Sequence, residues 1–465
     1  MLSYKLFAKN ITNEKEEFMK IVDVLNDLLW NKLLIFLLLG TGIYYTFRLR
    51  FLQVRKFKFI HKVALGDVFK RGDKADKDGM SSFQALATSI AAQVGTGNLA
   101  GVATAIATGG PGAIFWMWIS AFLGMGTIFG EAVLAQKYVD RIDGEVTGGP
   151  AFYLKNGVNS KFLAGFFAVA IIIALGFVGN MVQSNSIAVA LNTAFNVPTW
   201  IAGVVAAIFA ALVFVGGMER IASFTGIVVP FMAILYIVGS IVIMVLNYTQ
   251  IIPAFKIIIS SAFSARAAVG GAIGVTVKEA VRYGISRGLF SNEAGMGSTP
   301  HAHAVAKVDH PAEQGLVAIF GVIFDTLVIC TITAFINITT GAYEQGLTGI
   351  EMTQAAFSLG LGNFGSKFIA VSLFFFAFST IIGWYYFGES NIKYLFGKKG
   401  INVYRIVVII FIILGSILSV DQVWPIADLF NGLMVIPNVI GLFILSPQVI
   451  TVLRDYENNF LINRK

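Results

Sequence analysis

SSFQALATSIAAQVGTGNLAGVATAIATGG, residues Ser81–Gly110, is long and uncharged enough to cross a bilayer, yet Gly95-Thr96-Gly97-Asn98 stands in its middle. Glycine destabilises a helix interior, and the amide of Asn98 brings polar groups to the depth of the lipid chains. Backbone N–H and C=O groups freed by a break there need partners in protein, ions, solute or trapped water. Paired broken helices at mid-membrane are typical of the binding sites of secondary transporters.

The composition of the chain also indicates a membrane protein. Of its 465 residues, 56% are hydrophobic and 13% are charged, whereas soluble domains carry about 25% charge. The apolar runs are continuous, which favours helices over the alternating strands of an outer-membrane barrel. The single cysteine, Cys330, excludes an internal disulfide. Most of the net charge of +8 lies in loops beside apolar runs, so membrane topology explains it better than nucleic acid.

Apolar runs of ~20 residues predict the membrane spans. Eleven runs qualify: 31–48, 83–108, 112–138, 162–190, 199–217, 221–246, 270–306 (interrupted), 315–340, 364–388, 403–420 and 424–446. We therefore expect an all-α polytopic membrane protein. Its expected parts are a polar segment at 1–30, an extra helix at 31–48, repeats of five spans at 83–246 and 270–446, and a tail at 447–465.

A second broken segment supports this division. Ile285–Pro300, ISRGLFSNEAGMGSTP, is too polar for a plain span and contains three glycines and a proline. After the extra helix, the two breaks fall in spans one and six of the remaining ten. Halves of five spans have opposite topology, as an inverted repeat requires.

Charged loops predict the orientation. The segment from Arg48 to Lys77 carries ten Lys or Arg residues and should be cytoplasmic. Alternation then places the N-terminus outside and the C-terminus inside, in the inner or plasma membrane of a prokaryotic cell. The loops near 192–199 and 341–351, which contain no Lys or Arg, fall outside.

Polar side chains inside apolar runs are the candidate site residues. Gly95-x-Gly97 lacks the spacing and the preceding strand of a dinucleotide loop, and helix packing does not explain its polar neighbours, so a ligand site is favoured there. Adjacent hydroxyls at Ser379 and Thr380 could bind a cation or only bond back to their own helix. The amide of Gln183, on the same face as Gly179, could contact solute or another helix.

Acidic and histidine residues leave further alternatives. Glu131, Glu293, Asp325 and Asp428 could carry protons or bind a cation, or could pair with Lys137, Arg282 or Arg287. Structural pairing or capping is favoured for Glu131, Asp325 and Asp428. His301 and His303 point in opposed directions on a helix and lack partners at metal-ligand spacing, so neither a metal site nor a membrane enzyme is favoured.

Long motifs resemble one family of transporters. Gly95–Tyr138, Gly148–Leu154 (GGPAFYL), Arg287–Ala304 (RGLFSNEAGMGSTPHAHA) and Phe378–Glu389 (FSTIIGWYYFGE) resemble the alanine/glycine:cation symporters. This resemblance implies membership of the amino acid–polyamine–organocation superfamily. It implies a five-plus-five inverted repeat of the leucine-transporter type, here with one extra N-terminal helix.

The resemblance also implies where ligands bind. A sodium site would use the carbonyls of Ala91 and Val94 with the hydroxyls of Ser379 and Thr380. The amino-acid pocket would be formed by Gln93, Thr96, Gly97, Gly179, Gln183, Phe290, Asn292 and Trp384. Trp384 and Phe290 would admit a methyl side chain and exclude large ones.

We therefore expect a transporter rather than an enzyme, importing alanine and glycine by alternating access with Na⁺ as coupling ion. Proton coupling through Glu131 or Glu293 is the alternative. No catalytic residues and no organic cofactor are expected. The expected partners are the amino acid, the ion and the lipid bilayer, with no nucleic acid, and the chain should function as a monomer.

Overall fold

The computed structural model describes residues 17–66, 75–264, 276–418 and 420–463. Helical turns at 17–26 lead into the first half of the chain, whose helices and strands are η1 Asp27–Leu33, α2 Leu34–Arg48, α3 Leu52–Arg55, α4 Phe57–Gly66, β1 Met80–Ser81, α5 Ser82–Gln93, η2 Gly97–Gly101, α6 Val102–Gly109, α7 Ala113–Lys137, β2 Asp140–Ile142, β3 Glu145–Thr147, α8 Pro150–Asn156, α9 Lys161–Ile171, η3 Ile172–Gly179, α10 Asn180–Phe195, α11 Thr199–Phe214, α12 Gly217–Leu246, η4 Tyr248–Gln250 and α13 Ile251–Ser261. The second half contains α14 Val277–Asn292, α15 Pro300–Ala304, β4 Ala306–Lys307, α16 Pro311–Val322, η5 Ile323–Cys330, α17 Thr331–Thr339, η6 Ala342–Glu344, α18 Gly349–Leu361, α19 Asn363–Phe396, η7 Gly397–Gly400, α20 Ile401–Ile417, α21 Val420–Asp455, η8 Tyr456–Phe460 and α22 Leu461–Asn463.

The helices make this chain a multi-pass membrane protein. Among the described residues, six helical stretches are long and apolar enough to cross a membrane. The pair Ser82–Gln93 and Gly97–Gly109, bent by 49°, can form a seventh. Two predicted spans, 364–388 and 403–420, lie in one stretch, Asn363–Ile417, and the span at 199–217 is the shorter helix Thr199–Phe214. The count of eleven and the inverted repeat therefore stay predictions.

Several elements differ from the sequence interpretation. Helices α13 and α18 occupy segments that were predicted to connect spans, because both are short or partly polar. The described part of the expected polar segment 1–30 is helical from residue 17 and continues into α2. The predicted span 270–306 begins outside the described residues, and the rest of it is α14, a non-helical turn and α15.

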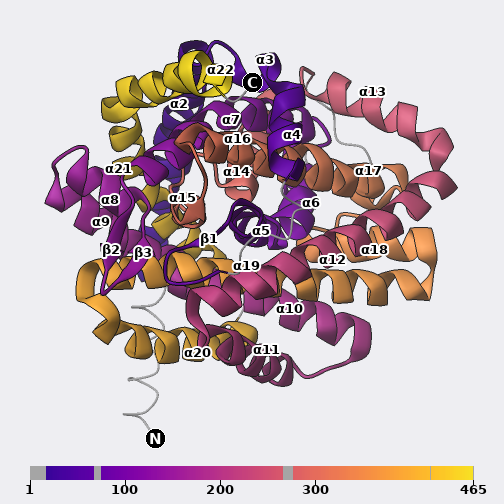
Figure 1. Ribbon diagram of the computed structural model, residues 1–465. Coiled ribbons are helices and arrows are strands. Elements are labelled where there is room, and N and C mark those ends of the chain that lie inside the picture. Colours follow the sequence, from indigo (N-terminus) through magenta and orange to yellow (C-terminus); the bar gives the residue numbers. More distant parts are fainter. Residues whose placement is uncertain (1–16, 67–74, 265–275, 419, 464–465) are drawn as a thin grey trace, which may run out of the picture.

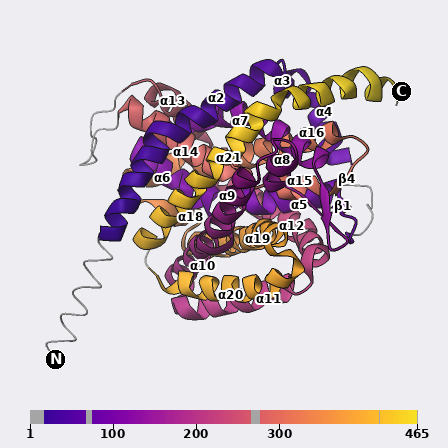
Figure 2. The same cartoon turned by 90° about the vertical axis from the view of Figure 1, so that its left-hand side faces the viewer.

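The two broken helices lie at the centre of the molecule. In Figure 1, α5 and α15 are surrounded by the other helices, with α19 crossing below them. Helix α7 packs against α14, α16 and α2, while α19 packs against α5 and α10. Figure 2 shows α2 alongside α21, and α11 beside α20 at the lower edge. Nearly every residue of α5 is buried, although the helix carries polar side chains. The break is therefore enclosed by protein rather than by lipid.

A short parallel pairing joins the two broken segments at one end. Strand β1 precedes α5, strand β4 follows α15, and Met80 pairs with Ala306. Nearby, the Lys307 ammonium contacts an Asp76 carboxylate oxygen at 2.9 Å. The hydrogen bond from Lys307 lowers the pKa of exposed Asp76. Together with the antiparallel pairing of β2 and β3, these strands are small additions to an otherwise all-α fold.

Candidate functional site

The first break exposes backbone carbonyls at the end of α5. The helix begins at a capping box formed by Ser81 and Gln84 and ends at Gln93. Val94 then leaves the helical region, with φ −85° and ψ 90°. The N–H of Gly95 donates to the Asn98 side-chain oxygen at 2.9 Å, which caps the turn leading into η2. The last carbonyls of α5 consequently lack the helical partners that a continuous helix would provide.

Helix α19 brings two hydroxyls to these carbonyls. Thr380 Oγ1 lies 2.9 Å from the Ala91 oxygen and 3.4 Å from the Val94 oxygen. Ser379 Oγ lies 3.5 Å from the Ala91 oxygen. The helices approach closely here, because a Cβ on Gly383 would sit 3.0 Å from the backbone nitrogen of Ala92. The four oxygens named in the sequence prediction are thus gathered at one buried point.

The spacing of these oxygens suits a small hard cation. Ligands at ~2.4 Å from an ion in octahedral geometry lie roughly 3.4 Å from one another. The observed separations of 2.9–3.5 Å are close to that value. Both hydroxyls also donate to the Phe376 carbonyl at 2.9 and 3.0 Å, which is the bond expected of Ser or Thr inside a helix. Both alternatives raised by the sequence are therefore compatible with the geometry.

The second break is held open by a buried carboxylate. Gly295 and Gly297 adopt left-handed backbone conformations, with φ of 86° and 81°. Their N–H groups each donate to Glu131 on α7 at 2.9 Å, and Asn438 on α21 donates to the same carboxylate at 2.6 Å. Glu131 therefore accepts hydrogen bonds from backbone N–H groups that have no helical partner at the break. Its contacts are those of a structural residue and include neither Lys137 nor Arg282.

Polar side chains connect the two breaks. The Gln93 side chain donates to the Asn292 carbonyl at 2.7 Å. The Asn98 amide and the Ser291 hydroxyl both donate to Asp325 on η5, at 2.6 and 3.1 Å. The sequence interpretation favoured structural pairing or capping for Asp325; the structure gives it neutral donors from both breaks instead of a basic partner. Asp428 does pair with a basic residue, Arg287, at 3.6 Å.

The predicted pocket residues form one contiguous group around the breaks. The Thr96 N–H donates to the Gln183 side-chain oxygen at 3.3 Å. A Cβ on Gly97 would lie 3.4 Å from Ser291 and 3.6 Å from the Phe290 ring. Within the described residues, the side-chain oxygens of Gln93 and Thr96 are buried without a hydrogen-bond partner. Buried polar atoms normally have partners, so these two oxygens are exceptions.

Aromatic rings limit the space at this group. The Trp384 and Phe290 rings meet edge to face, with centroids 6.4 Å apart. A Cβ on Gly179 would come within 2.7 Å of the Trp384 ring, so only glycine allows this approach. The Trp384 indole N–H donates to Glu293 at 2.6 Å. These contacts fix the orientation of Trp384.

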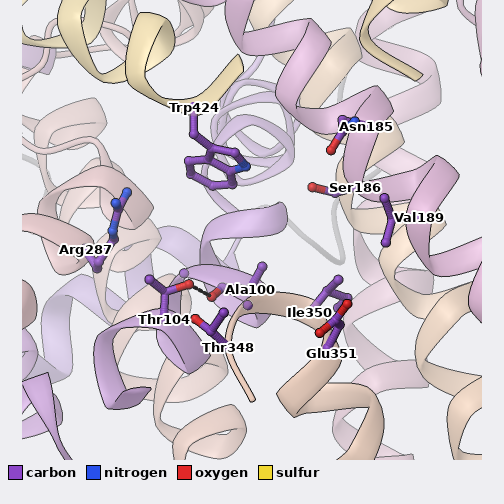
Figure 3. Close-up of a pocket in the computed structure, with 12 residues that line it drawn as sticks. Ala100, Thr104, Asn185, Ser186, Val189, Arg287, Thr348, Ile350, Glu351 and Trp424 are labelled. Carbon is purple, nitrogen blue, oxygen red and sulfur yellow. Dashed lines mark hydrogen bonds between the residues drawn. The ribbon is translucent and has the colours of Figure 1, made fainter. Parts of the chain in front are cut away.

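A cavity of about 410 Å³ lies next to the site. Figure 3 shows Trp424 and Arg287 on one side of it and Asn185, Ser186 and Val189 on the other, with Ala100 between them. The Trp424 ring packs on Phe290 at 5.8 Å between centroids, and Arg287 lies 5.5 Å from the Trp424 ring. The cavity thus reaches the aromatic residues that cover the pocket.

The histidines are bonded within the protein. His301 contacts the Ser298 carbonyl at 2.6 Å and the Asn391 amide at 2.8 Å, and His303 contacts Gln314 at 2.7 Å. Among the described residues, no group of three or more His, Cys, Asp or Glu side chains could hold a metal ion.

Sequence reasoning omitted Ser291 and Thr326, which line the breaks, and it named Asn98 and Glu293 without including them in the predicted pocket. The sequence did point to Asn98, because its polar amide side chain stands within the break of an otherwise apolar run. Nothing in the sequence pointed to Thr326: its hydroxyl accepts from the Asn292 amide at 3.1 Å, a contact between distant segments.

Comparison with known proteins identifies the family to which this chain is similar. The sodium:alanine symporter family matches residues 15–464. The chain is 45% identical over 450 residues to the sodium/alanine symporter AgcS of Methanococcus maripaludis, covering 95% of this chain and 98% of that protein. It is 47% identical over 439 residues to the probable sodium/glutamine symporter GlnT of Bacillus subtilis, covering 94% and 90%.

A solved structure shares the fold. The Eremococcus coleocola manganese transporter aligns with a TM-score of 0.50 and 14% identity, covering 75% of this chain and 74% of the other. At that identity the likeness concerns the fold alone. Because the family match spans nearly the whole chain and close relatives are sodium symporters, this chain belongs to the sodium:alanine symporter family, whose coupling ion is Na⁺ and whose members are transporters rather than enzymes.

Proposed function

We propose that this chain imports alanine and glycine together with Na⁺ by alternating access across the inner or plasma membrane of a prokaryotic cell. The observation that carries the proposal is the junction of the two breaks. There, Gln93 Oε1 and Thr96 Oγ1 are buried without a hydrogen-bond partner among the described residues, and Gly97 adjoins the Phe290 ring, which meets Trp384 edge to face. We further propose that the monomer is the transporting unit.

The sodium ion is proposed to bind among the carbonyls of Ala91 and Val94 and the hydroxyls of Ser379 and Thr380. Oxygen ligands are those that hard cations prefer. The site joins α5 to α19, so an ion there would hold the first broken helix against its neighbour. Such an ion would favour one conformation of the break and thereby support amino-acid binding, which is the basis of coupling.

The amino-acid carboxylate is proposed to bind at the start of η2. No Lys or Arg lies in the span Ser81–Gly110, so backbone N–H groups and the helix dipole supply the positive potential. The Gln183 oxygen on the Thr96 N–H marks such an acceptor position. Gly97→Val would place branched carbons against Ser291 and Phe290, so alanine binding should be lost.

We propose that the pocket selects amino acids by the small size of their side chains. Trp384 is fixed by Glu293, by Phe290 and by its approach to Gly179, so a side chain larger than methyl would meet the ring. A relative named as a probable glutamine symporter makes this point worth testing directly, because glutamine is much larger than alanine.

The orientation is also a proposal. Residues 348–351, at the start of α18, line the cavity, and the segment 341–351 that leads into this helix has no Lys or Arg. The positive-inside rule places such a segment outside. The cavity would then be the external route to the site.

Uptake into liposomes tests the function. Purified protein should accumulate labelled alanine and glycine when an inward sodium gradient is imposed, and leucine and glutamine should compete poorly. A proton gradient without sodium should not drive uptake. Uptake driven equally by protons alone, or glutamine preferred to alanine, would contradict the proposal. Alanine amide lacks the carboxylate charge, so it should compete poorly as well.

A further inference from the structure

Glu293 occupies an unusual backbone position at the end of α14. Its φ is 58°, which is left-handed, and its side chain is buried. Glycine or asparagine usually takes this position after a helix, because other residues cost about 1 kcal/mol or more there. Neither the backbone conformation nor the burial of this position favours a glutamate. The presence of a carboxylate there therefore needs another explanation.

The carboxylate has two neutral donors. The Trp384 indole nitrogen donates to Oε1 at 2.6 Å, and the Ser298 hydroxyl donates to Oε2. A carboxylate offers about four acceptor positions, so roughly two remain. No ion pair joins Glu293 to a Lys, Arg or His among the residues that the structure describes. A buried charge without an opposite charge is costly by several kcal/mol.

Comparison with the other buried acids singles out Glu293. Asp428, which is partly exposed, has Arg287 as a partner, and buried Glu389 has Lys393 at 3.0 Å. Glu131 and Asp325 lack a basic partner, but each accepts hydrogen bonds from three different residues. Glu293 is thus the least satisfied of the three buried carboxylates without a basic partner in the described chain.

Its position connects the charge to the proposed pocket. Glu293 directly follows Asn292, whose carbonyl accepts from Gln93, and its carboxylate bonds to Trp384. Trp384 in turn meets Phe290 edge to face. A solute bounded by Gln93, Phe290 and Trp384 would therefore lie near this carboxylate.

We propose that Glu293 binds the ammonium group of the transported amino acid. The proposal rests on the function proposed above and adds the second charge of the zwitterion. The carboxylate of the amino acid binds at the start of η2. The ammonium group of the same amino acid supplies the cation that Glu293 lacks. A charge-assisted bond of this kind would discriminate against acids that lack an amino group.

Binding of paired ligands tests this role. Alanine and propionate differ by the ammonium group, and their affinities are measured by calorimetry in detergent with saturating sodium. The wild type should prefer alanine strongly. In Glu293→Gln, the preference should fall by about 10- to 100-fold, since hydrogen bonds to charged groups contribute that much. Glu279→Gln, the same change at a partly exposed position in the capping box that begins the same helix, should leave the preference intact.

Each other outcome overturns the proposal. Parallel loss of alanine and propionate binding would mean that Glu293 only orients Trp384. A raised sodium requirement with an unchanged preference would mean that it binds the coupling ion. If Glu293→Gln does not fold, Glu293→Asp is used, because it shortens the side chain by one methylene and moves the charge away from the solute. This variant must weaken the preference for alanine over propionate. An unchanged preference refutes the proposal. A wild type that binds no neutral amino acid would instead refute the proposed function.

Discussion

Gly95→Ala is a small change at the point where the proposed sodium site meets the first break. A Cβ at residue 95 would lie 2.3 Å from Thr380 Oγ1 and 3.2 Å from Gln183 Oε1. Gly95 is not among the glycines with a left-handed backbone, so the effect is steric. To make room, the Thr380 hydroxyl must turn away from the Ala91 carbonyl or the two helices must separate.

The magnitude follows from overpacking. An extra methyl group in a well-packed interior costs about 1–3 kcal/mol. If this cost falls on the sodium-bound arrangement, the sodium concentration for half-maximal uptake should rise about 5- to 150-fold. The maximal uptake at saturating sodium should change much less, because the amino-acid pocket keeps its side chains.

The assay is sodium-dependent alanine uptake into liposomes, with thermal unfolding in detergent to monitor folding. Gly165→Ala is the matched control: it lies within α9, and a Cβ there meets nothing within 4 Å. It should leave the sodium dependence unchanged. An unchanged sodium dependence in folded Gly95→Ala would show that the close approach to Thr380 is irrelevant to ion binding.

Three further changes test other parts of the argument. Replacing Ser379 and Thr380 together with Ala should raise the sodium requirement far more than the alanine requirement at saturating sodium; equal effects on both would remove the ion assignment. Trp384→Ala should weaken alanine binding and relax the exclusion of valine and leucine, which competition assays would reveal as a changed rank order. Because Lys307 lowers the pKa of Asp76, their contact stabilises the fold above the ordinary aspartate range, about 4. The gap in melting temperature between wild type and Asp76→Asn should therefore be present at pH 7 and vanish as the pH falls through the lowered pKa; a constant gap would refute it.

The sequence predicted the long elements of the fold well. Continuous apolar runs gave bounds within a few residues for α7 and α12, because length and hydropathy decide such helices. Helices α13 and α18 were missed, because with 11 and 13 residues they are too short for a criterion of ~20 apolar residues. The bend at Gly95 was evident from glycine and asparagine together.

The candidate site was only partly accessible to sequence reasoning. The gathering of Ser379 and Thr380 with Ala91 and Val94 was suggested by resemblance, since no local pattern links residues so distant in the chain. Arg287, the partner of Asp428, was among the basic residues that the sequence offered. The partners of Glu131 could not be foreseen, because it bonds to backbone N–H groups of Gly295 and Gly297, and backbone donors leave no trace in composition.

The pairing of Met80–Ser81 with Ala306–Lys307 has a mechanical consequence. At that end of the molecule, the start of one interrupted helix and the end of the other are joined in a single short parallel sheet. The two interrupted helices can tilt about this sheet, but they cannot separate there while its hydrogen bonds hold. Under the alternating access proposed above, a passage on that side would open where the surrounding helices move away from the joined pair.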